Sequence, residues 1–457
     1  MLDLSGKHVA ILGLGVSGCA AARLCLARGA GVTAFDAKSW EQLSDDARGL
    51  KTKGVRVLAG GHPSAALKHV DLVVTSPGFP SFPELESSGV RVIAEIELAV
   101  QALPPSIPIV AVGGTNGKST TTSLIGALFE AHGKHPFVGG NFGEPVSDYV
   151  GHPFDVMVLE VSSFQLERLE TFKPKVSILL NVTPDHLDRY PTFDDYAHTK
   201  GNAFERQTEG DLAVVPFDDA ICEAQARRGK APVTTFGPGG DVDVTPEAIV
   251  DRALGHTYAR REMALVGSHN ALNIAAAIAA VRPFGVPAEA IRSTLRTFRG
   301  LAHRTAFVAD IHGVRVYDDS KGTNVGASVT ALRGVPQEKV VLIAGGREKG
   351  GSYEPLISVL RTKGRGVVVL GEAAGTIARA VGSLLPIRRI ATSPAEDADE
   401  RLARTMDDVV RAAFELAQPG DAVLLSPACS SLDMFRDYKH RGEAFVSAVE
   451  RFAKERP

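Results

Sequence analysis

The sequence has few cysteines, few aromatic residues and no excess of charge of either sign. Its 50 Lys and Arg residues are matched by 53 Asp and Glu residues, and the formal net charge is −3. This balance argues against a nucleic-acid partner, because such proteins present clustered positive charge. Four cysteines in 457 residues argue against a disulfide framework and predict a reducing compartment, the cytoplasm. We expect Cys19 and Cys25, which have no metal-ligand spacing, to be buried as small apolar residues.

Long hydrophobic runs are also missing. The most apolar late stretch, residues 271–281, is alanine-rich and too short to cross a bilayer, so we expect a buried helix and no membrane partner. Apolar residues make up 44% and charged residues 23%, as in an ordinary soluble globular protein. A chain of this length predicts about three domains.

Apolar β-branched runs alternate with amphipathic segments along the whole chain, which is typical of an α/β fold with mainly parallel sheets. Residues 305–308 and 314–317 predict a β-hairpin. We expect an N-terminal Rossmann-like domain at 1–95, a central P-loop-type domain with a mostly parallel sheet at 96–301, and a C-terminal Rossmann-like domain at 302–457. The predicted strands cover residues 8–12, 32–36, 72–75, 109–112, 156–160, 176–181, 340–344, 366–370 and 422–426.

A glycine-rich loop follows the strand predicted at 109–112 and leads into a helical pattern. Backbone N–H groups at such a helix N-terminus bind phosphate oxygens, a lysine neutralises phosphate charge, and a hydroxyl can ligate Mg²⁺. The usual spacing would put glycine where this chain has Val112, and the alternative is a Ser/Thr-capped turn without a ligand. The predicted ATP-binding residues are Gly114, Thr115, Asn116, Gly117, Lys118, Ser119 and Thr120.

A second glycine-rich turn lies near the N-terminus, where residues 13–18 read Gly-Leu-Gly-Val-Ser-Gly. Asp36 closes the next predicted strand, so its carboxylate is placed for a ribose hydroxyl. Such a turn would hold any nucleotide diphosphate, including UDP, although a turn without ligand has the same pattern. The predicted residues of this site are Gly15, Val16, Ser17 and Asp36, with Ser76, Pro77 and Gly78 from a second loop.

Polar residues follow two strands of the predicted central domain. Glu160 ends one strand, and an acidic residue there suits Mg²⁺; the alternative is a surface carboxylate that caps the next helix. His186 lies between Asp185 and Asp188 after the other strand, in a loop where ligand-facing groups collect. Magnesium seldom takes histidine, so polar packing is the alternative for His186.

Lys200 falls in the middle of an apolar stripe at helical spacing within residues 193–204. Burial would favour its neutral amine, which can capture CO₂ to form a carbamate; the alternative is an ammonium that reaches water along the stripe edge. Asn270 and Asn273 share one face of the predicted alanine-rich helix and suit a base or phosphate. In the last third, Lys321, Lys349 and nearby serines follow predicted strands and suit a dicarboxylate, although helix caps and solvated lysines remain alternatives.

Together these motifs resemble the Mur ligases, along essentially the whole chain and in order. The resemblance rests on residues 13–18, 114–120, 159–167, 181–191, 269–270, 319–324 and 426–428. It implies UDP-sugar-, ATP- and amino-acid-binding domains, in that order. It also implies ligation of D-glutamate to UDP-N-acetylmuramoyl-L-alanine with ATP, two Mg²⁺ sites, a CO₂-derived carbamate on Lys200 and a monomer. The signature Asp-Asn-Pro-Arg of the branch that adds a diamino acid is absent from the sequence.

The resemblance assigns further site residues. It implies that the catalytic residues are Lys118, His186 and Lys200. It implies that the metal ligands are Ser119, Thr120, Glu160, His186 and Lys200. It adds Asn270, Asn273, Arg304 (in a His303-Arg304 pair) and Asp319 to the ATP site, and Asn141, Ser162 and His186 to the UDP-sugar site. It places glutamate against Lys321, Thr323, Lys349, Ser431 and Tyr438, the last where the family often has phenylalanine.

Four alternatives stay open at this stage. Related ligases using L-glutamate would need the same crevice, and a folylpolyglutamate-synthase-like enzyme would share the ATP and glutamate chemistry. An NAD-dependent dehydrogenase would use residues 13–18 but leave the P-loop without a role. A nucleotide-binding regulator would need no set of Glu160, His186 and Lys200.

Overall fold

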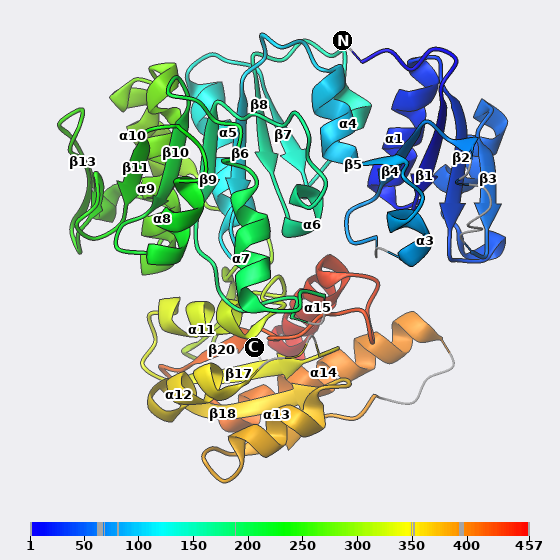
Figure 1. Ribbon diagram of the computed structural model, residues 1–457. Coiled ribbons are helices and arrows are strands. Elements are labelled where there is room, and N and C mark those ends of the chain that lie inside the picture. The colour runs from blue at the N-terminus through cyan, green and yellow to red at the C-terminus, as the bar shows by residue number, and fades with distance from the viewer. Residues whose placement is uncertain are drawn as a thin grey trace. The chain divides into compact units, whose positions relative to one another are not determined.

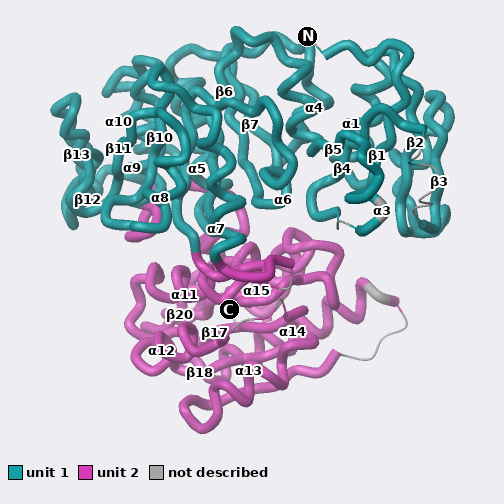
Figure 2. Tube along the Cα trace, in the orientation of Figure 1, with its two compact units in different colours: residues 1–182, 194–264, 271–298 teal, residues 183–193, 265–270, 299–457 magenta. Residues whose placement is uncertain are grey.

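The computed structural model describes residues 2–61, 67, 69–79, 82–187, 189–348, 350, 352–392 and 397–455. The chain divides into two compact units, which Figure 2 shows in different colours. Unit 1 comprises residues 1–182, 194–264 and 271–298, and unit 2 comprises residues 183–193, 265–270 and 299–457. The segments 183–193 and 265–270 therefore pack with the C-terminal part of the chain.

Unit 1 begins with a parallel five-stranded sheet of order β3-β2-β1-β4-β5. Alternate residues of β1 enter two apolar cores, Val9 and Ile11 on one face and Ala10 and Leu12 on the other, as a parallel sheet covered on both faces requires. The strands are β1 (His8–Leu12), β2 (Gly31–Asp36), β3 (Arg56–Ala59), β4 (Leu72–Thr75) and β5 (Arg91–Ala94). The helices are α1 (Val16–Ala27), α2 (Asp45–Gly49), α3 (Pro83–Glu86) and α4 (Glu95–Ala102).

The second sheet of unit 1 has the order β14-β13-β12-β11-β10-β9-β6-β8-β7 (Figure 1). It is parallel from β7 to β12, and β12, β13 and β14 pair antiparallel. Its strands are β6 (Ile109–Gly113), β7 (Pro136–Gly140), β8 (Val156–Glu160), β9 (Val176–Leu179), β10 (Leu212–Pro216), β11 (Val233–Phe236), β12 (Val242–Val244), β13 (Ala248–Asp251) and β14 (His256–Ala259). Its helices are α5 (Lys118–Ala131), α6 (Ser163–Leu166), α7 (Phe193–Gly201), α8 (Ala220–Ala226), α9 (Ser268–Val281) and α10 (Ala288–Thr297).

Unit 2 contains a six-stranded sheet of order β15-β16-β20-β17-β18-β19, in which only β15 runs antiparallel. Its two apolar cores take alternate residues of β17, packed with α11, α12 and α13 on one face and with α14 and α15 on the other (Figure 1). The strands are β15 (Ala306–Ile311), β16 (Val314–Asp318), β17 (Val340–Gly345), β18 (Gly364–Leu370), β19 (Ile387–Arg389) and β20 (Ala422–Leu425). The helices are α11 (Val325–Gly334), α12 (Glu354–Lys363), α13 (Ala374–Val381), α14 (Ala398–Leu416) and α15 (Tyr438–Glu455).

The structure confirms the α/β fold with mostly parallel sheets. All nine predicted strands are present within two residues of their predicted bounds, and the predicted hairpin is the antiparallel pair β15–β16. The predicted helix at 271–281 is the buried part of α9, and all four cysteines are buried and free. In the described part of the chain, no helix is both long and apolar enough to span a membrane.

Candidate functional site

The P-loop predicted in unit 1 joins β6 to α5, so its backbone N–H groups lie at a helix N-terminus. Gly114 and Gly117 have φ angles of 137° and 87°, which favour glycine. The loop is held from the end of β9: the Asn116 N–H donates to Asn181 Oδ1 at 2.9 Å, and Asn181 Nδ2 donates to the Asn116 carbonyl at 3.0 Å. Val112, the departure from the usual spacing, is fully buried inside β6. The loop between β6 and α5 therefore forms without a glycine at position 112.

Two lysines contact this loop. Lys118 Nζ donates to the carbonyl oxygens of Gly114 and Thr115 at 3.0 and 2.9 Å. Lys200 Nζ donates to the same Gly114 oxygen at 2.8 Å and lies 4.5 Å from the ring centroid of Tyr196. Lys200 is only 3% exposed, so the alternative in which its ammonium reaches water is wrong. The apolar face of α7 thus places a buried amine against the P-loop.

Glu160 lies at the end of β8 and is 3% exposed. Its carboxylate accepts a short hydrogen bond from the Ser119 hydroxyl and a second from Asn141 Nδ2 at 2.9 Å. The structure therefore brings together Ser119, Glu160 and Asn141, and the reading of Glu160 as a surface carboxylate is wrong. A carboxylate beside a hydroxyl is the donor set that Mg²⁺ prefers. Thr120 is also buried in the first turn of α5, and Ser162 caps α6 directly after β8.

His186 belongs to unit 2, whereas Glu160 and Lys200 belong to unit 1. His186 has a φ of 54°, and its Nε2 lies 3.7 Å from Asp185 Oδ2. The same carboxylate oxygen accepts a hydrogen bond from Asn324 Nδ2 at 3.0 Å, which ties this segment to the start of α11. Asp188 lies outside the described residues.

The N-terminal glycine-rich turn has the close packing that its pattern predicts. A Cβ on Gly18 would lie 1.8 Å from the Gly13 carbonyl oxygen, whereas a Cβ on Gly15 would meet nothing within 4 Å. Ser76 Oγ donates to that Gly13 oxygen at 2.8 Å, so the two predicted loops meet. Asp36 accepts hydrogen bonds from the N–H groups of Leu14 and Lys38 at 2.7 and 2.9 Å. Its carboxylate thus already fixes the turn.

The exposure of this turn suits a ligand. Val16, at the first position of α1, is 66% exposed, and Ser17 beside it is half-buried. Pro77 and Gly78 follow Ser76 in the second loop, where Gly78 has a φ of 78°.

The two asparagines of α9 are both buried. Asn273 packs on the P-loop, since a Cβ on Gly117 would lie 2.4 Å from its Oδ1. Asn270 Nδ2 donates to the Val266 carbonyl at 2.7 Å, and both these residues belong to unit 2. The structure thus places Asn273 beside the predicted phosphate site.

In unit 2, Asp319 follows β16 and is buried. Ser426 Oγ donates to its Oδ2 at 2.6 Å, and the Thr305 N–H donates to its Oδ1 at 3.1 Å. Burial raises the pKa of Asp319 to about 7. Arg304 precedes Thr305 in the same turn, and its neighbour His303 lies 2.5 Å from Asp318 Oδ2. That hydrogen bond raises the pKa of His303.

Two of the predicted glutamate-binding residues, Lys321 and Tyr438, meet at the start of α15. Lys321 Nζ lies 3.9 Å from the ring centroid of Tyr438, a cation–π distance. Beside them the Thr323 N–H donates to the Lys321 carbonyl at 2.7 Å, and Ser431 is buried in the loop after β20. Lys349 lies outside the described residues.

Three residues that the sequence reasoning left without a role support these sites. The Tyr196 hydroxyl lies 3.2 Å from Thr115 Oγ1, and the Asn181 side chain accepts a hydrogen bond from the P-loop. Arg441 is buried in unit 2, where it donates to the carbonyls of Ser320 and Cys429 at 2.8 and 3.3 Å. Burial lowers the pKa of Arg441 to about 10. Two positions in the sequence indicated these residues: Tyr196 lies four residues before Lys200 on one helical face, and Asn181 ends a predicted strand.

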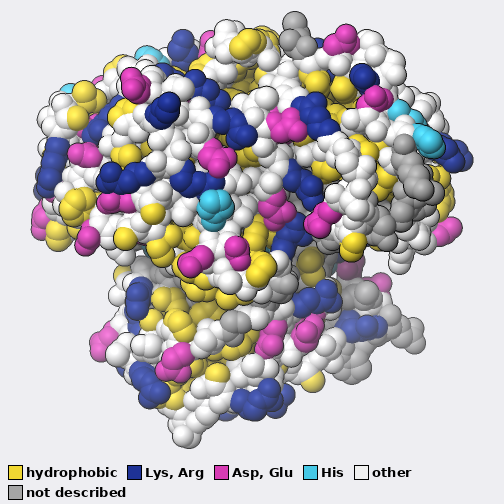
Figure 3. Space-filling view, in the orientation of Figure 1, with side chains coloured by type: hydrophobic (Ala, Val, Ile, Leu, Met, Phe, Trp, Pro, Cys, Tyr) yellow, Lys and Arg dark blue, Asp and Glu magenta, His cyan; other side chains and the backbone are white. Residues whose placement is uncertain are grey.

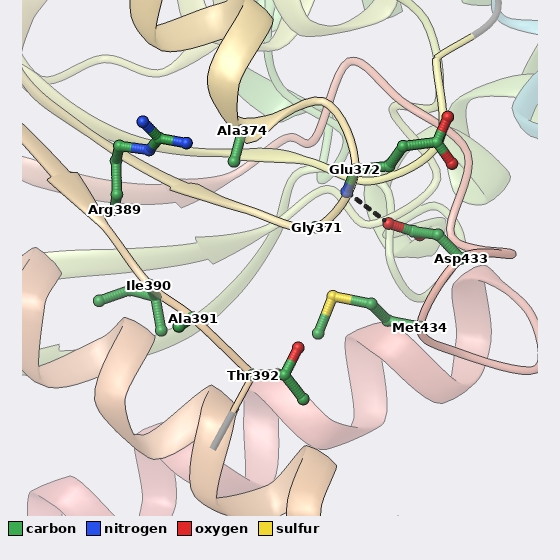
Figure 4. A pocket seen from close by; sticks show the side chains of 9 residues that line it. All are labelled: Gly371, Glu372, Ala374, Arg389, Ile390, Ala391, Thr392, Asp433 and Met434. Atoms are coloured by element: carbon green, nitrogen blue, oxygen red, sulfur yellow. Dashed lines mark hydrogen bonds between the residues drawn. The ribbon is translucent and has the colours of Figure 1, made fainter. Parts of the chain in front are cut away.

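A separate cavity of about 520 Å³ lies in unit 2 beyond the ends of β18 and β19. Two of its lining residues are hydrogen-bonded: the Glu372 N–H donates to Asp433 Oδ2 at 3.0 Å (Figure 4). Arg389, the last residue of β19, and Thr392, in the segment that follows, also line it (Figure 4). As far as the described residues go, its lining includes none of the predicted site residues.

The surface in Figure 3 carries lysine and arginine side chains interspersed with aspartate and glutamate. Across the described residues, no three His, Cys, Asp or Glu side chains are grouped to hold a metal ion by themselves. A cation beside Glu160 would therefore need oxygen ligands from hydroxyls, water or substrate, as Mg²⁺ commonly has.

Family models match most of the chain. The Mur ligase MurD-like N-terminal domain matches residues 7–94, the Mur ligase middle domain matches 112–281, and the Mur ligase glutamate ligase domain matches 303–429. Proteins named UDP-N-acetylmuramoylalanine–D-glutamate ligase from Geobacter metallireducens, Pelotomaculum thermopropionicum and Myxococcus xanthus are each 40% identical to this chain. These alignments cover 98% of this chain and 98%, 98% and 99% of the relatives.

Solved structures share the fold. The pseudomurein peptide ligase type C of Methanothermus fervidus has a TM-score of 0.61 at 16% identity, over 98% of this chain and 100% of that one. The UDP-N-acetylmuramate-alanine ligase of Thermotoga maritima has a TM-score of 0.60 at 19% identity with the same coverage. A folylpolyglutamate synthase of Mycobacterium tuberculosis has a TM-score of 0.55 at 15% identity, over 76% of this chain and 91% of that one.

Proposed function

The chain belongs to the Mur ligase family, and we propose that it joins D-glutamate to UDP-N-acetylmuramoyl-L-alanine with ATP, in the assembly of peptidoglycan precursors. The observation that carries the proposal is the 40% identity, over 98% of the chain, to relatives named for that reaction. The positions of Lys118 and Glu160 beside one P-loop support it, because phosphoryl transfer needs positive charge and a metal cation beside the phosphates.

In the first step, the terminal carboxylate oxygen of UDP-N-acetylmuramoyl-L-alanine attacks the γ-phosphorus of ATP. The bond to ADP breaks, and an acyl phosphate forms. The loop N–H groups between Gly114 and Lys118 bind the phosphates, and Lys118 exchanges its loop carbonyls for phosphate oxygens. Positioning and charge neutralisation account for most of the rate in such transfers.

In the second step, the amine of D-glutamate attacks the acyl carbon, loses a proton, and phosphate leaves. Lys321, Thr323, Lys349, Ser431 and Tyr438 are the residues that we assign to glutamate. The 3.9 Å contact between Lys321 and the Tyr438 ring supports this, since it holds an ammonium in place for a carboxylate. Arg304, Asn270, Asn273 and Asp319 complete the proposed nucleotide site.

The residues around Glu160 fit magnesium. Their carboxylate and hydroxyl oxygens would hold one ion, and Ser119, Thr120 and Glu160 are the proposed ligands, with His186 for a second ion. When bound, Mg²⁺ neutralises charge that develops on the transferred phosphate. A carbamate on Lys200 would supply a further anionic ligand, and the burial of that amine beside the P-loop supports the assignment.

We assign UDP to the first glycine-rich turn, through Gly15, Val16, Ser17, Asp36 and the loop 76–78, and the rest of the sugar substrate to Asn141, Ser162 and His186. The open space over Gly15 supports this. The corresponding domains are residues 1–95 for the UDP-sugar, 96–301 for ATP and 302–457 for glutamate. We further propose that the protein acts in the cytoplasm and as a monomer. Light scattering of the purified protein measures its mass and so tests the monomer.

Phosphate release from ATP tests the function. With UDP-N-acetylmuramoyl-L-alanine present, we expect release with D-glutamate and none without an amino acid. A preference for L-glutamate would keep the chemistry and change the amino acid. Activity only with a folate substrate would replace the proposal by the folylpolyglutamate-synthase-like alternative, whose fold this chain shares. Bound nicotinamide, seen by its absorbance, would indicate a dehydrogenase, and nucleotide binding without any release would indicate a regulator.

A further inference from the structure

Helix α4 of unit 1 carries two carboxyl groups that are almost completely buried. Glu95 is 1% exposed and Glu97 is 0% exposed. Residues two apart on a helix point to different sides, so the two carboxyl groups reach different neighbours. Burying a carboxyl group is costly unless donors surround it or it keeps its proton, so the hydrogen bonds of each group show which neighbours it fixes.

Glu97 is held by four donors. The N–H and hydroxyl of Thr171 donate at 2.7 and 2.5 Å, the Phe172 N–H at 3.1 Å, and Gln101 Nε2 at 2.7 Å. Three of these donors come from the segment between α6 and β9. Hydrogen bonds to a charged acceptor are roughly twice as strong as neutral ones, so Glu97 fixes this segment firmly against α4.

Glu95 holds a different segment. The N–H and hydroxyl of Ser147 donate to its Oε1 at 3.0 and 2.5 Å. Ser147 lies in the short 3₁₀ helix Val146–Tyr149, which follows β7. The next residue, Asp148, forms a bidentate pair with Arg23 of α1 at 2.7 and 2.8 Å. The segment after β7 is thus anchored to two helices that cover the first sheet.

Apolar packing holds α4, the helix that carries Glu95 and Glu97, in place. Leu98 and Ala102 enter the core of the first sheet, while Ile96, Ala99 and Leu103 enter the core of the second. Figure 1 shows α4 beside both sheets of unit 1. The helix therefore cannot shift without opening two cores.

The two anchored segments begin at residues assigned to the sugar substrate. Asn141 starts the segment that ends at Ser147, and it contacts Glu160 through its backbone N–H and its side chain, each at 2.9 Å. Ser162 starts the segment that ends at Thr171 and caps α6. We propose that Glu95 and Glu97 are positioning residues for UDP-N-acetylmuramoyl-L-alanine, which act by fixing the far ends of the segments that carry Asn141 and Ser162. This inference rests on the proposed function.

The ATP site is supported differently. Residues 114–118 are held by Asn181, which follows β9, and contact the lysines Lys118 and Lys200. In the hydrogen bonds of the described residues, this loop has no donor or acceptor on α4. Loss of the α4 anchors should therefore weaken use of the sugar substrate more than use of ATP, whose site they reach only through the contact of Asn141 with Glu160.

The test compares Glu97→Gln, Thr171→Val and Ser147→Ala with Glu130→Gln, which changes an exposed glutamate of α5 in the same unit. We expect Glu97→Gln to raise the KM for UDP-N-acetylmuramoyl-L-alanine about tenfold, with the KM for ATP changed less than about twofold and the control unchanged. Thr171→Val and Ser147→Ala each remove one hydroxyl donor to a buried glutamate, and each should raise the same KM about threefold. These milder variants decide the question if Glu97→Gln does not fold.

The dissociation constant of UDP-N-acetylmuramoyl-L-alanine, measured by calorimetry, separates the two proposals. If the wild type binds this substrate without ligating it, the proposed function fails, and weaker binding by the variants still supports the positioning role. If a folded Glu97→Gln protein and Thr171→Val both keep the wild-type dissociation constant, or if the KM for ATP rises equally, the positioning role is overturned. A wild type that does not bind the substrate overturns both.

Discussion

The side-chain amines of Lys118 and Lys200 donate to one oxygen atom, the carbonyl of Gly114, at 3.0 and 2.8 Å. The two residues are far apart in the chain, one at the start of α5 and the other near the end of α7. Both amines therefore lie against the loop that we assign to the phosphates of ATP. We expect different roles for them: Lys118 as an ammonium that neutralises phosphate charge, and Lys200 as the amine that takes up CO₂.

Replacement of Lys118 by alanine should abolish ligation. The loss of the lysine that neutralises the β- and γ-phosphates should lower kcat/KM by at least about a thousandfold, because electrostatic stabilisation is the main contribution in phosphoryl transfer. Phosphate release with both substrates measures this, and circular dichroism checks the fold. Near-normal ligation by a folded Lys118→Ala protein would refute the role given to the loop.

Lys200 should carry a carbamate when the protein is equilibrated with bicarbonate. The amine is buried beside the P-loop, and an unprotonated lysine amine reacts with CO₂ to form a carbamate. A carbamate resonance from ¹³C-bicarbonate should appear in wild type and in Lys118→Ala, and vanish in Lys200→Ala. A signal of equal size in the Lys200→Ala protein would place the modification on another residue.

Two glycines of one turn should lose different amounts of stability on the same substitution. A Cβ on Gly18 would lie 1.8 Å from the Gly13 carbonyl oxygen, whereas a Cβ on Gly15 would meet nothing within 4 Å. Gly18→Ala should lower the free energy of unfolding by about 2–3 kcal/mol, and Gly15→Ala by less than about 1 kcal/mol. Urea denaturation measures both, and equal effects would show that the turn is not closely packed.

Glu95 should make the protein less stable as the pH rises. Burial raises its pKa from 4.5 to about 7, with Ser147 opposing the shift and Asp148 adding to it. Between these two values the folded protein keeps a proton that the unfolded chain has lost. The free energy of unfolding contributed by Glu95 therefore falls as the pH rises through this window.

Glutamine at position 95 cannot ionise. The free energy of unfolding of Glu95→Gln, relative to that of wild type, should therefore be about 2–3 kcal/mol higher at pH 8 than at pH 5. Urea midpoints at the two pH values measure the difference. The matched control Glu130→Gln should keep the wild-type pH dependence, since that side chain is exposed. If Glu95→Gln keeps it too, Glu95 does not titrate in this range.

The sequence by itself determined the fold class, the positions of the glycine-rich turns and the family. These features are local: a buried parallel strand is a continuous apolar run, and a phosphate-binding turn needs glycine at fixed positions. The weaker strands of the sheets were not predicted, among them β3 and β19, because they are short and partly exposed and so have no continuous apolar run. Asn141 and Ser162 were assigned to the UDP-sugar site by resemblance alone.

Only the tertiary structure decided which distant residues meet. The stripe that contains Lys200 predicted a helix face, but its burial against Gly114 depends on how α7 packs on the second sheet. Nothing in the sequence indicated that Glu95 and Glu97 are buried, since a glutamate on an amphipathic helix is usually solvated. Their burial follows from α4 lying between two apolar cores, a contact between segments that are far apart in the chain.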